Sequence, residues 1–418
     1  MSVEFKEINA VYGIASPWRI TRITTDTTAN EVFLRVCCGD ESGLACPMCD
    51  RVCPVYDRRA RKWRHLDTGT YRTYVVTELL RVKCPDHGVR TITVPWAERS
   101  ARMTYEFEGM VIDWLQEASI SAVSRLLGLS WTAIDGVMQR AVQRGLARRS
   151  TGSFTRIGVD ETTYKKGHKY ITVVSDSITG AVVYAGEGRT KQSLKRWYDE
   201  CSPEQLEQIE SVSMDMWPAY IHTTTECVPG AEEKIAFDRF HVAKKIGEAV
   251  DLVRRQENRE LKKEDRDDLV GTKYDWLTNT ENMSAQQKKR FRQLKTSSLK
   301  TARAWAIKEL SQKLWHYVSP AWARKGWKRW LSWAMRCRLE PMKKVAKTVK
   351  EHLWGIINAI ILKVSNGPAE SINSRIKTVK IRSRGFRNVD RLMNAIYFYL
   401  GGLDLYPESV RIRPRSLK

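Results

Sequence analysis

The chain has 418 residues, which is too long for one compact core of ordinary size, so we expect two to four domains. Lys and Arg total 71 against 48 Asp and Glu, and the formal net charge of +23 favours nucleic acid as a partner, although a membrane surface or an acidic protein would also suit it. The longest apolar run is far shorter than the roughly 20 residues that span a bilayer, and the N-terminus has no apolar signal core. We therefore expect a soluble cytoplasmic protein with no membrane partner.

Residues 1–100 are predicted to form a small β-rich domain. Segments such as EVFLRV, YRTYVVTELLRV and VRTITVPW alternate apolar and polar side chains and are interrupted by Gly and Pro. Six of the nine cysteines fall in the first quarter of the chain, which indicates a local metal site rather than a disulfide scaffold.

Two short cysteine motifs, CPMC and CPDH, provide the candidate ligands of that metal. Together they supply four nitrogen and sulfur ligands of the kind that zinc binds in a tetrahedron: Cys46, Cys49, Cys84 and His87. The spacing predicts a structural zinc ribbon in which the metal contributes stability. Cys53 or His65 could replace His87 as the fourth ligand, and a set of reduced cysteines without metal is the alternative.

Residues 101–150 are predicted to form a helix, a tight turn and a second helix. Gly128 separates the two in SAVSRLLGLSWTAIDGVMQRAV, and Ser130 is placed to cap the second. Apolar residues lie at core spacing in both: Ala122, Val123, Leu126, Leu129, Ile134 and Val137. This pattern is typical of a helix-turn-helix that enters a major groove, with a plain helical hairpin as the alternative. The predicted DNA-facing residues are Trp131, Thr132, Asp135, Gln139 and Arg140.

Residues 151–241 are predicted to form the first part of an α/β domain. TRIGVD, KYITVVSD and AVVYAGEG have the pattern of three strands, SLKRWYDE that of a helix, and SVSMD and KIAFD that of two more strands. Residues 242–363 are predicted to be almost continuous helix, rich in Lys, Arg, Glu and Trp. Residues 364–418 then begin a last helical stretch, so the helical block is expected to interrupt the α/β domain.

Three acidic residues lie at the ends of predicted strands or at the start of a predicted helix of this α/β domain. Asp160 and Asp215 are each expected to end a strand of one sheet, where two carboxylates can bind the same divalent ions. Glu370 begins the helix after the insertion, and Asn373 and Lys377 follow on the same face, available to phosphate. A single Asp at a strand end is ordinarily a solvated cap. The order of the three acids in a basic chain instead favours two metal ions acting on a phosphorus centre.

The segment after Glu370 is crowded with cations, which are usually a solvated face. Beside a phosphoryl-transfer site they are better placed to bind the DNA backbone, and the candidates, with Asn373, are Lys377, Lys380, Arg382 and Arg384. The tryptophans of the helical block could stack on distorted bases. Most are expected in the core, because Trp buries a large area in helical packing.

Several motifs together resemble one family. CPMC and CPDH, the helix-turn-helix, GVDETTYKKG, SMDMWPAY, FDRFHVAK and NGPAESINSRIK resemble, over almost the whole chain, the DDE transposases of bacterial insertion sequences in the ISL-three family. The resemblance implies a ribonuclease H-like core in which Asp160, Asp215 and Glu370 bind Mg²⁺ or Mn²⁺, with Asp238 and His241 near the active site. It also implies an insertion of more than 100 residues, in agreement with the interval 370 − 215 = 155. His87 stands where this family often has cysteine.

The expected fold is therefore a multidomain α+β chain: an N-terminal zinc ribbon, a helix-turn-helix, and a ribonuclease H-like α/β core interrupted by an all-helical insertion domain. Such a protein would bind the terminal inverted repeats of its element and target DNA, cleave a strand and transfer the 3′ end. A homodimer associated with the bacterial nucleoid is expected. The rivals are a DNA-binding regulator with an inactive core and a structure-specific nuclease of the same fold.

Overall fold

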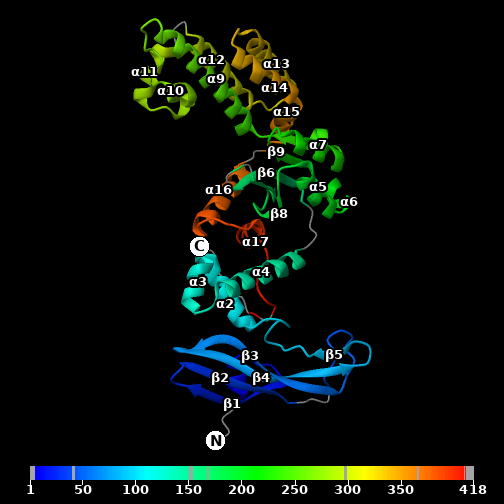
Figure 1. Cartoon of the computed structure of the whole chain (residues 1–418). Helices are drawn as coiled ribbons and strands as arrows, with labels where there is room; N and C mark the ends of the chain where they lie inside the picture. The colour runs from blue at the N-terminus through cyan, green and yellow to red at the C-terminus, as the bar shows by residue number, and fades with distance from the viewer. Residues whose placement is uncertain are drawn as a thin grey trace. The chain divides into compact units, whose positions relative to one another are not determined.

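The computed structural model describes residues 5–39, 43–149, 154–165, 167, 169–295, 299–364, 367–408 and 410. The chain divides into two compact units, which are Met1–Arg149 with Leu403–Lys418, and Ser150–Gly402 (Figure 1). Within the described residues, no helix combines the length and the apolar character that crossing a membrane requires.

The first unit is built on a five-stranded sheet. Its strands are β1 (Trp18–Asp26), β2 (Glu31–Cys38), β3 (Val55–Thr68), β4 (Tyr71–Cys84) and β5 (Gly88–Thr91), preceded by the short helix α1 (Phe5–Val11). The order is β1-β2-β4-β3, with β5 paired to β4. The predicted β-rich character is confirmed, although the sheet begins at Trp18 and not near residue 30. The long β3–β4 hairpin separates the two cysteine motifs.

Three helices complete the first unit: α2 (Tyr105–Glu117), α3 (Ile120–Leu127) and α4 (Trp131–Arg148). Gly128 ends α3 at a φ of 62°, in the left-handed region that glycine adopts without strain, and the Ser130 hydroxyl accepts a hydrogen bond from the Ala133 amide at 3.2 Å. The predicted cap is therefore confirmed. Leu126 is wrong as a core residue, because it is 69% exposed and Leu127, one turn after the buried Val123, packs inward instead.

The described residues from Leu403 onward belong to this first unit. The sequence analysis assigned 364–418 as a whole to the α/β core, whereas the structure groups the residues from Leu403 with the N-terminal helices. Arg144 donates to the Leu405 carbonyl at 2.8 Å, and Arg148 donates to the Tyr406 carbonyl at 2.5 Å. These bonds to the backbone tie the C-terminal segment to α4.

The second unit contains a mixed five-stranded sheet. Its strands are β6 (Arg156–Lys165), β7 (Lys169–Asp176), β8 (Val182–Glu187), β9 (Ser211–Met214) and β10 (Ile235–Phe237), in the order β10-β9-β6-β7-β8. The first three are antiparallel neighbours, and β9 and β10 run parallel to β6. The five predicted strands are present in the predicted order along the chain. The expected strand end at Asp160 is wrong, because β7 pairs with β6 as far as Lys165 and holds it extended.

Helices cover both faces of this sheet. The helices α5 (Lys191–Glu200), α6 (Pro203–Glu207), α7 (Pro218–Cys227) and α8 (Ala231–Lys234) follow β8 and β9, and residues of α5 and α7 pack with Ile157 and Val159 of β6. The helices α16 (Gly367–Arg382) and α17 (Val389–Leu400) cover the opposite face of β7 and β8. Since strand residues alternate between faces, Gly158 and Asp160 are turned toward α16.

The helical block, Arg239–Ile361, lies between β10 and α16. It consists of α9 (Arg239–Lys262), α10 (Lys273–Leu277), a 3₁₀ turn (Thr280–Asn282), α11 (Ala285–Lys295), α12 (Lys300–Leu314), α13 (Pro320–Arg336), α14 (Glu340–Glu351) and α15 (Leu353–Ile361). One continuous hydrophobic core joins it to the sheet, and Figure 1 shows the block extending from the β9 end of the sheet.

The tryptophans of the helical block are divided between core and surface. Trp276, Trp327 and Trp330 are fully buried, and the Trp330 indole donates to the Ile307 carbonyl at 2.8 Å. Trp322 is 58% exposed and Trp333 is 38% exposed, both on α13.

Candidate functional site

Four side chains of the first unit meet as a candidate metal centre. The ligand atoms of Cys46, Cys49, Cys84 and His87 all lie within 4.8 Å of one another. Cys46 and Cys49 come from the loop after β2, Cys84 is the last residue of β4, and His87 lies in the turn before β5. Cys84 Sγ lies 3.5 Å from His87 Nδ1 and 3.7 Å from Cys49 Sγ. Three thiols and an imidazole converging in this way fit a structural Zn²⁺.

The two alternatives for the fourth ligand have other partners. His65 is 3% exposed, and its Nδ1 lies 2.9 Å from the Thr104 hydroxyl, outside the cluster. Burial lowers the pKa of His65 to about 4, so this imidazole is neutral near pH 7. Cys53 is buried beside the cluster and donates its thiol to the Arg51 carbonyl at 3.2 Å. Neither belongs to the group of four.

The pairing of two parallel strands brings Asp160 and Asp215 together. Val159 of β6 is in register with Met214 of β9, so the next residue of each strand is an aspartate. Both carboxylates are partly buried, and each accepts a hydrogen bond from the amide that follows it, at 2.8 Å for Asp160 and 2.6 Å for Asp215. Two adjacent carboxylates at the edge of a sheet can bind one divalent cation.

Helix α16 lies along β6 and adds polar groups to this pair. A Cβ on Gly158 would lie 3.5 Å from the Ala369 Cβ, at ordinary van der Waals distance, so α16 packs directly over β6 at this position. One turn later Asn373 donates to Asp160 Oδ2 at 2.7 Å, and toward the helix end Lys380 donates to the Thr163 carbonyl at 2.7 Å. The expectation that Asn373 is free to contact phosphate is wrong, because its amide is bonded to Asp160.

His241 connects the aspartate pair to a third acid. Its Nδ1 lies 3.2 Å from Asp215 Oδ2, and its Nε2 lies 3.7 Å from Asp238 Oδ2. Asp238 begins α9, accepting from the Phe240 amide at 3.1 Å, and it is 6% exposed. Among the described residues its Oδ2 has no hydrogen-bond partner. The predicted neighbour His241 thus contacts Asp215 on one side and lies within ion-pair distance of Asp238, the other predicted neighbour, on the other.

The electrostatics of the site follow from burial and from His241. Burial, assisted by the nearby charges of Glu161 and Asp215, raises the pKa of Asp160 to about 6. Burial acts in the same direction on Asp215, but the hydrogen bond and charge of His241 outweigh it and lower the pKa of Asp215. The same bond raises the pKa of His241. A cation is therefore favoured beside this cluster of acids.

Glu370 is placed by the first turn of α16. It is exposed and, among the described residues, has no hydrogen bond or ion pair with Asp160 or Asp215. It lies three residues before Asn373, on the same face of the helix. Glu370 and Asp238 also line one cavity of about 690 Å³.

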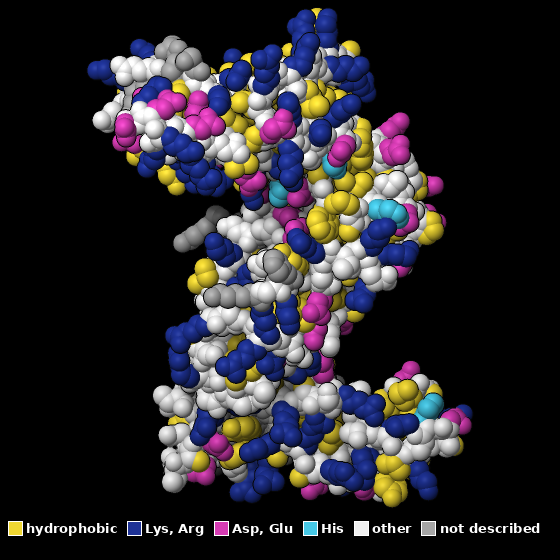
Figure 2. Space-filling model, turned by 45° about the horizontal axis from the view of Figure 1, so that its top comes forward, with side chains coloured by type: hydrophobic (Ala, Val, Ile, Leu, Met, Phe, Trp, Pro, Cys, Tyr) yellow, Lys and Arg dark blue, Asp and Glu magenta, His cyan; other side chains and the backbone are white. Residues whose placement is uncertain are grey.

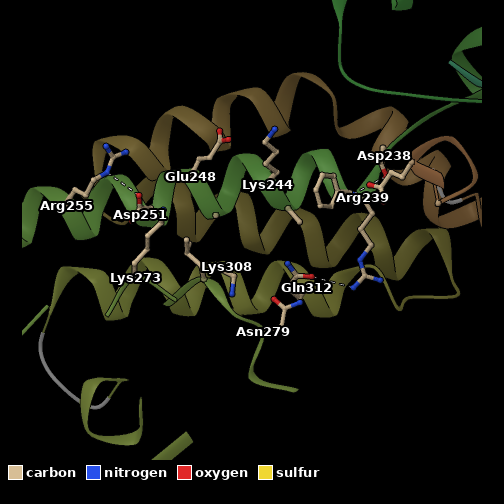
Figure 3. Close-up of a pocket in the computed structure, with 16 residues that line it drawn as sticks. Asp238, Arg239, Lys244, Glu248, Asp251, Arg255, Lys273, Asn279, Lys308 and Gln312 are labelled. Carbon is tan, nitrogen blue, oxygen red and sulfur yellow. Dashed lines mark hydrogen bonds and ion pairs between the residues drawn. The ribbon is translucent and has the colours of Figure 1, made fainter. Parts of the chain in front are cut away.

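The cavity extends from this end of the site along α9. Figure 3 shows Asp238, Lys244, Glu248, Asp251 and Arg255 in succession along that helix, with side chains of both charges. The cavity is also lined by Lys308 and Gln312 of α12, and by Lys273 and Asn279 of the segment that includes α10. Figure 3 also shows Arg239 at the end nearest Asp238, and its guanidinium donates to Gln312 Oε1 at 3.5 Å.

The predicted DNA-facing residues of α4 have different environments. Thr132 and Gln139 are exposed and Trp131 is half-buried. Asp135 is buried and accepts from Gln139 at 2.9 Å, so it is wrong as an exposed residue. Arg140 is bound to Glu108 of α2, which is 1% exposed, with Arg140 Nε donating at 2.9 Å. An arginine bound to a buried carboxylate stabilises the packing of α2 on α4 and is not free to read a base.

The basic residues of α16 and the following turn are also divided. Lys377 and Arg384 are exposed. Lys380 is bonded to Thr162 and Thr163 of β6, and the Arg382 guanidinium lies over the Tyr399 ring at 5.6 Å. Exposed cations can bind a DNA backbone directly, whereas the other two have partners within the unit.

Two further residues of the site were not predicted from the sequence. Glu161 follows Asp160, and burial together with the charge of Asp215 raises its pKa. Arg189 lies 3.7 Å from Glu161 and stacks between the rings of Tyr170 and Trp217, at 4.1 and 4.5 Å. The DE pair in GVDETT was a visible signal for Glu161, whereas no local pattern marks Arg189.

Comparison with known proteins agrees with this division of the chain. Residues 157–396 match a family model described as "Transposase", of the DDE type in the ISL3 family. Residues 92–142 match the helix-turn-helix domain of transposase family ISL3, and residues 43–87 match the zinc-finger of transposase IS204/IS1001/IS1096/IS1165.

Two curated relatives are similar over most of their length. The transposase for insertion sequence element IS1557 of Mycobacterium tuberculosis is 30% identical over 386 residues, covering 85% of this chain and 86% of the relative. The transposase for insertion sequence element IS1001 of Bordetella parapertussis is 26% identical over 373 residues, covering 88% and 90%.

Proposed function

The chain belongs to the ISL3 family of DDE transposases, and on that premise we propose that Asp160, Asp215 and Glu370 are the acids that hold the catalytic divalent metal. A DNA transposase with a helix-turn-helix and a zinc ribbon must bind DNA and break and join its strands. Mg²⁺ is the proposed ion, since carboxylate oxygens are the ligands that it prefers.

One observation carries this proposal. The register of β6 and β9 sets Asp160 and Asp215 side by side, and Asn373 fixes α16, the helix that carries Glu370, to Asp160. The segments β6, β9 and α16, which are distant in sequence, thereby meet at one site. A purely structural role would not require two adjacent carboxylates, partly buried, in a chain of net charge +23.

The sheet and its connections support a ribonuclease H-like core. The first strand is central, two antiparallel strands extend on one side of it, and two parallel strands extend on the other. The helical block leaves the core after β10 and returns before α16, as an insertion would. We assign residues 239–361 to that insertion, close to the 242–363 of the sequence prediction.

The residues around the carboxylates suit hydrolysis and transfer at phosphorus. A bound divalent ion would stabilise negative charge on the phosphate and lower the pKa of the attacking water or 3′-hydroxyl. His241 holds Asp215 in its ionised form, and Asn373 orients Asp160. Asp238 completes the set with a buried oxygen that has no hydrogen-bond partner among the described residues.

We assign recognition of the element's ends to the first unit. The residues of α4 best placed to reach base edges are Thr132, Gln139 and Trp131. The sheet is stabilised by zinc bound to Cys46, Cys49, Cys84 and His87. Lys377 and Arg384 are proposed to hold the backbone near the cleavage site. A homodimer is proposed because two ends must be held together.

Cleavage of DNA that carries the element's own terminal repeat tests the proposal. The intact protein with Mg²⁺ should release a discrete 3′ end, while Asp160→Asn, Asp215→Asn and Glu370→Gln should each lose cleavage and keep end binding. Glu248→Gln, an exposed acid in the same cavity, is the matched control and should cleave normally. A protein that binds the end but never cuts it would instead be a DNA-binding regulator with an inactive core. A protein that cuts branched DNA of any sequence would be a structure-specific nuclease.

A further inference from the structure

Helix α13 presents an exposed face on which every charged residue is a cation. Its charged residues are Arg324, Lys325, Lys328, Arg329 and Arg336, and all of them are exposed. At 100° per residue they fall within one half of the helix circumference. The other half is buried in the core through Ala323, Gly326, Trp327, Trp330 and Ala334.

This face carries no compensating negative charge of its own. The sequence PAWARKGWKRWLSWAMR contains no Asp or Glu. In the part of the chain that the structure describes, no ion pair links any of the five cations to a carboxylate, and Arg336 bonds instead to the Ser332 carbonyl at 3.1 Å. The cavity beside Glu370 differs, because Glu248 and Asp251 stand among its cations.

Two exposed aromatic rings border the cationic face. Trp322 and Trp333 are separated by eleven residues, about three turns, and so lie along the same edge of the helix. The Lys325 amine lies 4.8 Å from the Trp322 ring centre. A surface hollow of about 890 Å³ is lined by Lys325, Lys328 and Trp333. Figure 2 shows dark-blue Lys and Arg side chains gathered at the top of the view, over the helical block.

We infer that this α13 face binds the backbone of the target duplex into which the element is inserted. The inference rests on the proposed function, because it presumes strand transfer at the carboxylates of the same unit. Arg324 to Arg336 span roughly 18 Å along the helix, enough to meet several phosphates. Without acidic partners, these cations bind the phosphates by displacing counterions.

The side-chain chemistry favours target DNA over the element's ends. Recognition of a fixed end sequence needs donors and acceptors matched to base edges, which α4 of the first unit offers with Thr132 and Gln139. The α13 face has no amide or carboxylate side chain, and Lys is a point charge that suits any phosphate. The target duplex, which accepts the cut end, is the DNA partner whose sequence varies.

The test compares two triple variants of the full-length protein. Arg324→Gln, Lys328→Gln and Arg329→Gln together remove three charges from the α13 face. The matched control, Arg259→Gln, Lys262→Gln and Lys263→Gln, removes three exposed cations from the end of α9, where acidic residues follow closely. Thermal unfolding of both variants establishes that they are folded. Cleavage of the element's end, and strand transfer of a pre-cut end into a random-sequence duplex, are measured separately.

The α13 variant should cleave the end normally while strand transfer falls by roughly tenfold or more at about 150 mM salt. The slope of log affinity for random duplex against log salt should become shallower by roughly 2 to 3. The control variant should change neither strand transfer nor this slope. Equal strand transfer by both variants would overturn the inference and leave the catalytic proposal standing. Parallel loss of end binding would assign the face to the ends instead.

A conservative variant completes the experiment. Arg324→Lys with Arg329→Lys keeps the charge but removes the bidentate fork, so strand transfer should persist within about twofold if only phosphates are bound. Loss of strand transfer in this variant would mean that the face reads bases, which contradicts the inference. If the triple variant fails to fold, Lys325→Gln with Lys328→Gln, both on the outer surface, is measured in its place.

Discussion

Asn373 of α16 donates its side-chain amide to Oδ2 of Asp160 over 2.7 Å, across 213 residues of intervening sequence. A second, longer contact of 3.4 Å reaches the Glu161 carbonyl. The amide therefore fixes both the carboxylate of β6 and the rotation of the helix that carries Glu370. Orientation of one proposed metal ligand and placement of another depend on the same side chain.

Removal of this amide should weaken metal binding more than DNA binding. In Asn373→Ala, loss of the partner of Asp160 should raise the metal concentration needed for half-maximal cleavage by roughly 10- to 100-fold. End binding should not change, and the measurement is a Mg²⁺ titration of end cleavage. Ser374→Ala, the exposed neighbour on the same helix, is the control. An unaltered metal requirement in Asn373→Ala would contradict the orienting role.

Zinc content should separate the true ligands from the neighbouring thiol. Cys84→Ser should lose bound zinc, because the hydroxyl does not replace a thiolate ligand, and should lower the unfolding temperature. Cys53→Ser should retain the metal, since Cys53 is bonded to the Arg51 carbonyl and lies outside the group of four. Elemental analysis of the purified variants measures this. Zinc lost from Cys53→Ser and kept by His87→Ala would make Cys53 the fourth ligand.

The stability of the protein should depend on pH through His65. Its folded-state pKa of about 4 lies below the ordinary value of 6.5, so the unfolded chain binds more protons between these two pH values. Stability should consequently rise with pH across this window and be lost as pH falls from 6.5 toward 4, by roughly 3 kcal/mol for this group. Urea unfolding at both ends of the window, compared with His65→Gln, isolates the effect. Zinc release at low pH affects both proteins, so the difference between them reports on His65.

Two residues of α4 should respond in opposite ways to substitution. Arg140→Gln should lower the free energy of unfolding by roughly 1–3 kcal/mol, because it removes one partner of the buried Glu108 carboxylate. Gln139→Ala should leave stability nearly unchanged and weaken binding of the terminal repeat. Chemical unfolding and a mobility shift with the repeat, on the same preparations, measure the two effects. If folded Arg140→Gln alone lost end binding, Arg140 would be a DNA contact after all.

The sequence predicted the site's acids but not all of their surroundings. The order of the five strands around Asp160 and Asp215, with the helix α5 after β8, follows from local periodicity and is present, whereas α6, α7 and α8 were not predicted. The role of Asn373 was not predictable in this way. Helical spacing gives the face on which it lies, but the packing of Ile372 and Ile376 against β7 and β8 decides what that face meets. Its partner is a carboxylate rather than a phosphate for that reason.

Arg140 illustrates the same limit in the first unit. An arginine on the second helix of a helix-turn-helix is a natural candidate for base contact. Its partner Glu108 lies 32 residues earlier, on a helix whose position relative to α4 is a property of tertiary packing. The zinc ligands were more accessible to prediction, because closely spaced cysteine and histidine define both halves of the site within a few residues.

The helical block and the sheet have a common interior, and this determines how force can pass between them. A Cβ on Gly355 of α15 would lie 2.5 Å from the Phe237 ring, and the Asn358 amide donates to the Ile235 carbonyl at 2.9 Å. The block thus leaves the sheet at β10 and is fastened to the same strand on its return. A duplex held by the α13 face would therefore be connected to the sheet through β10, the strand that Asp238 follows.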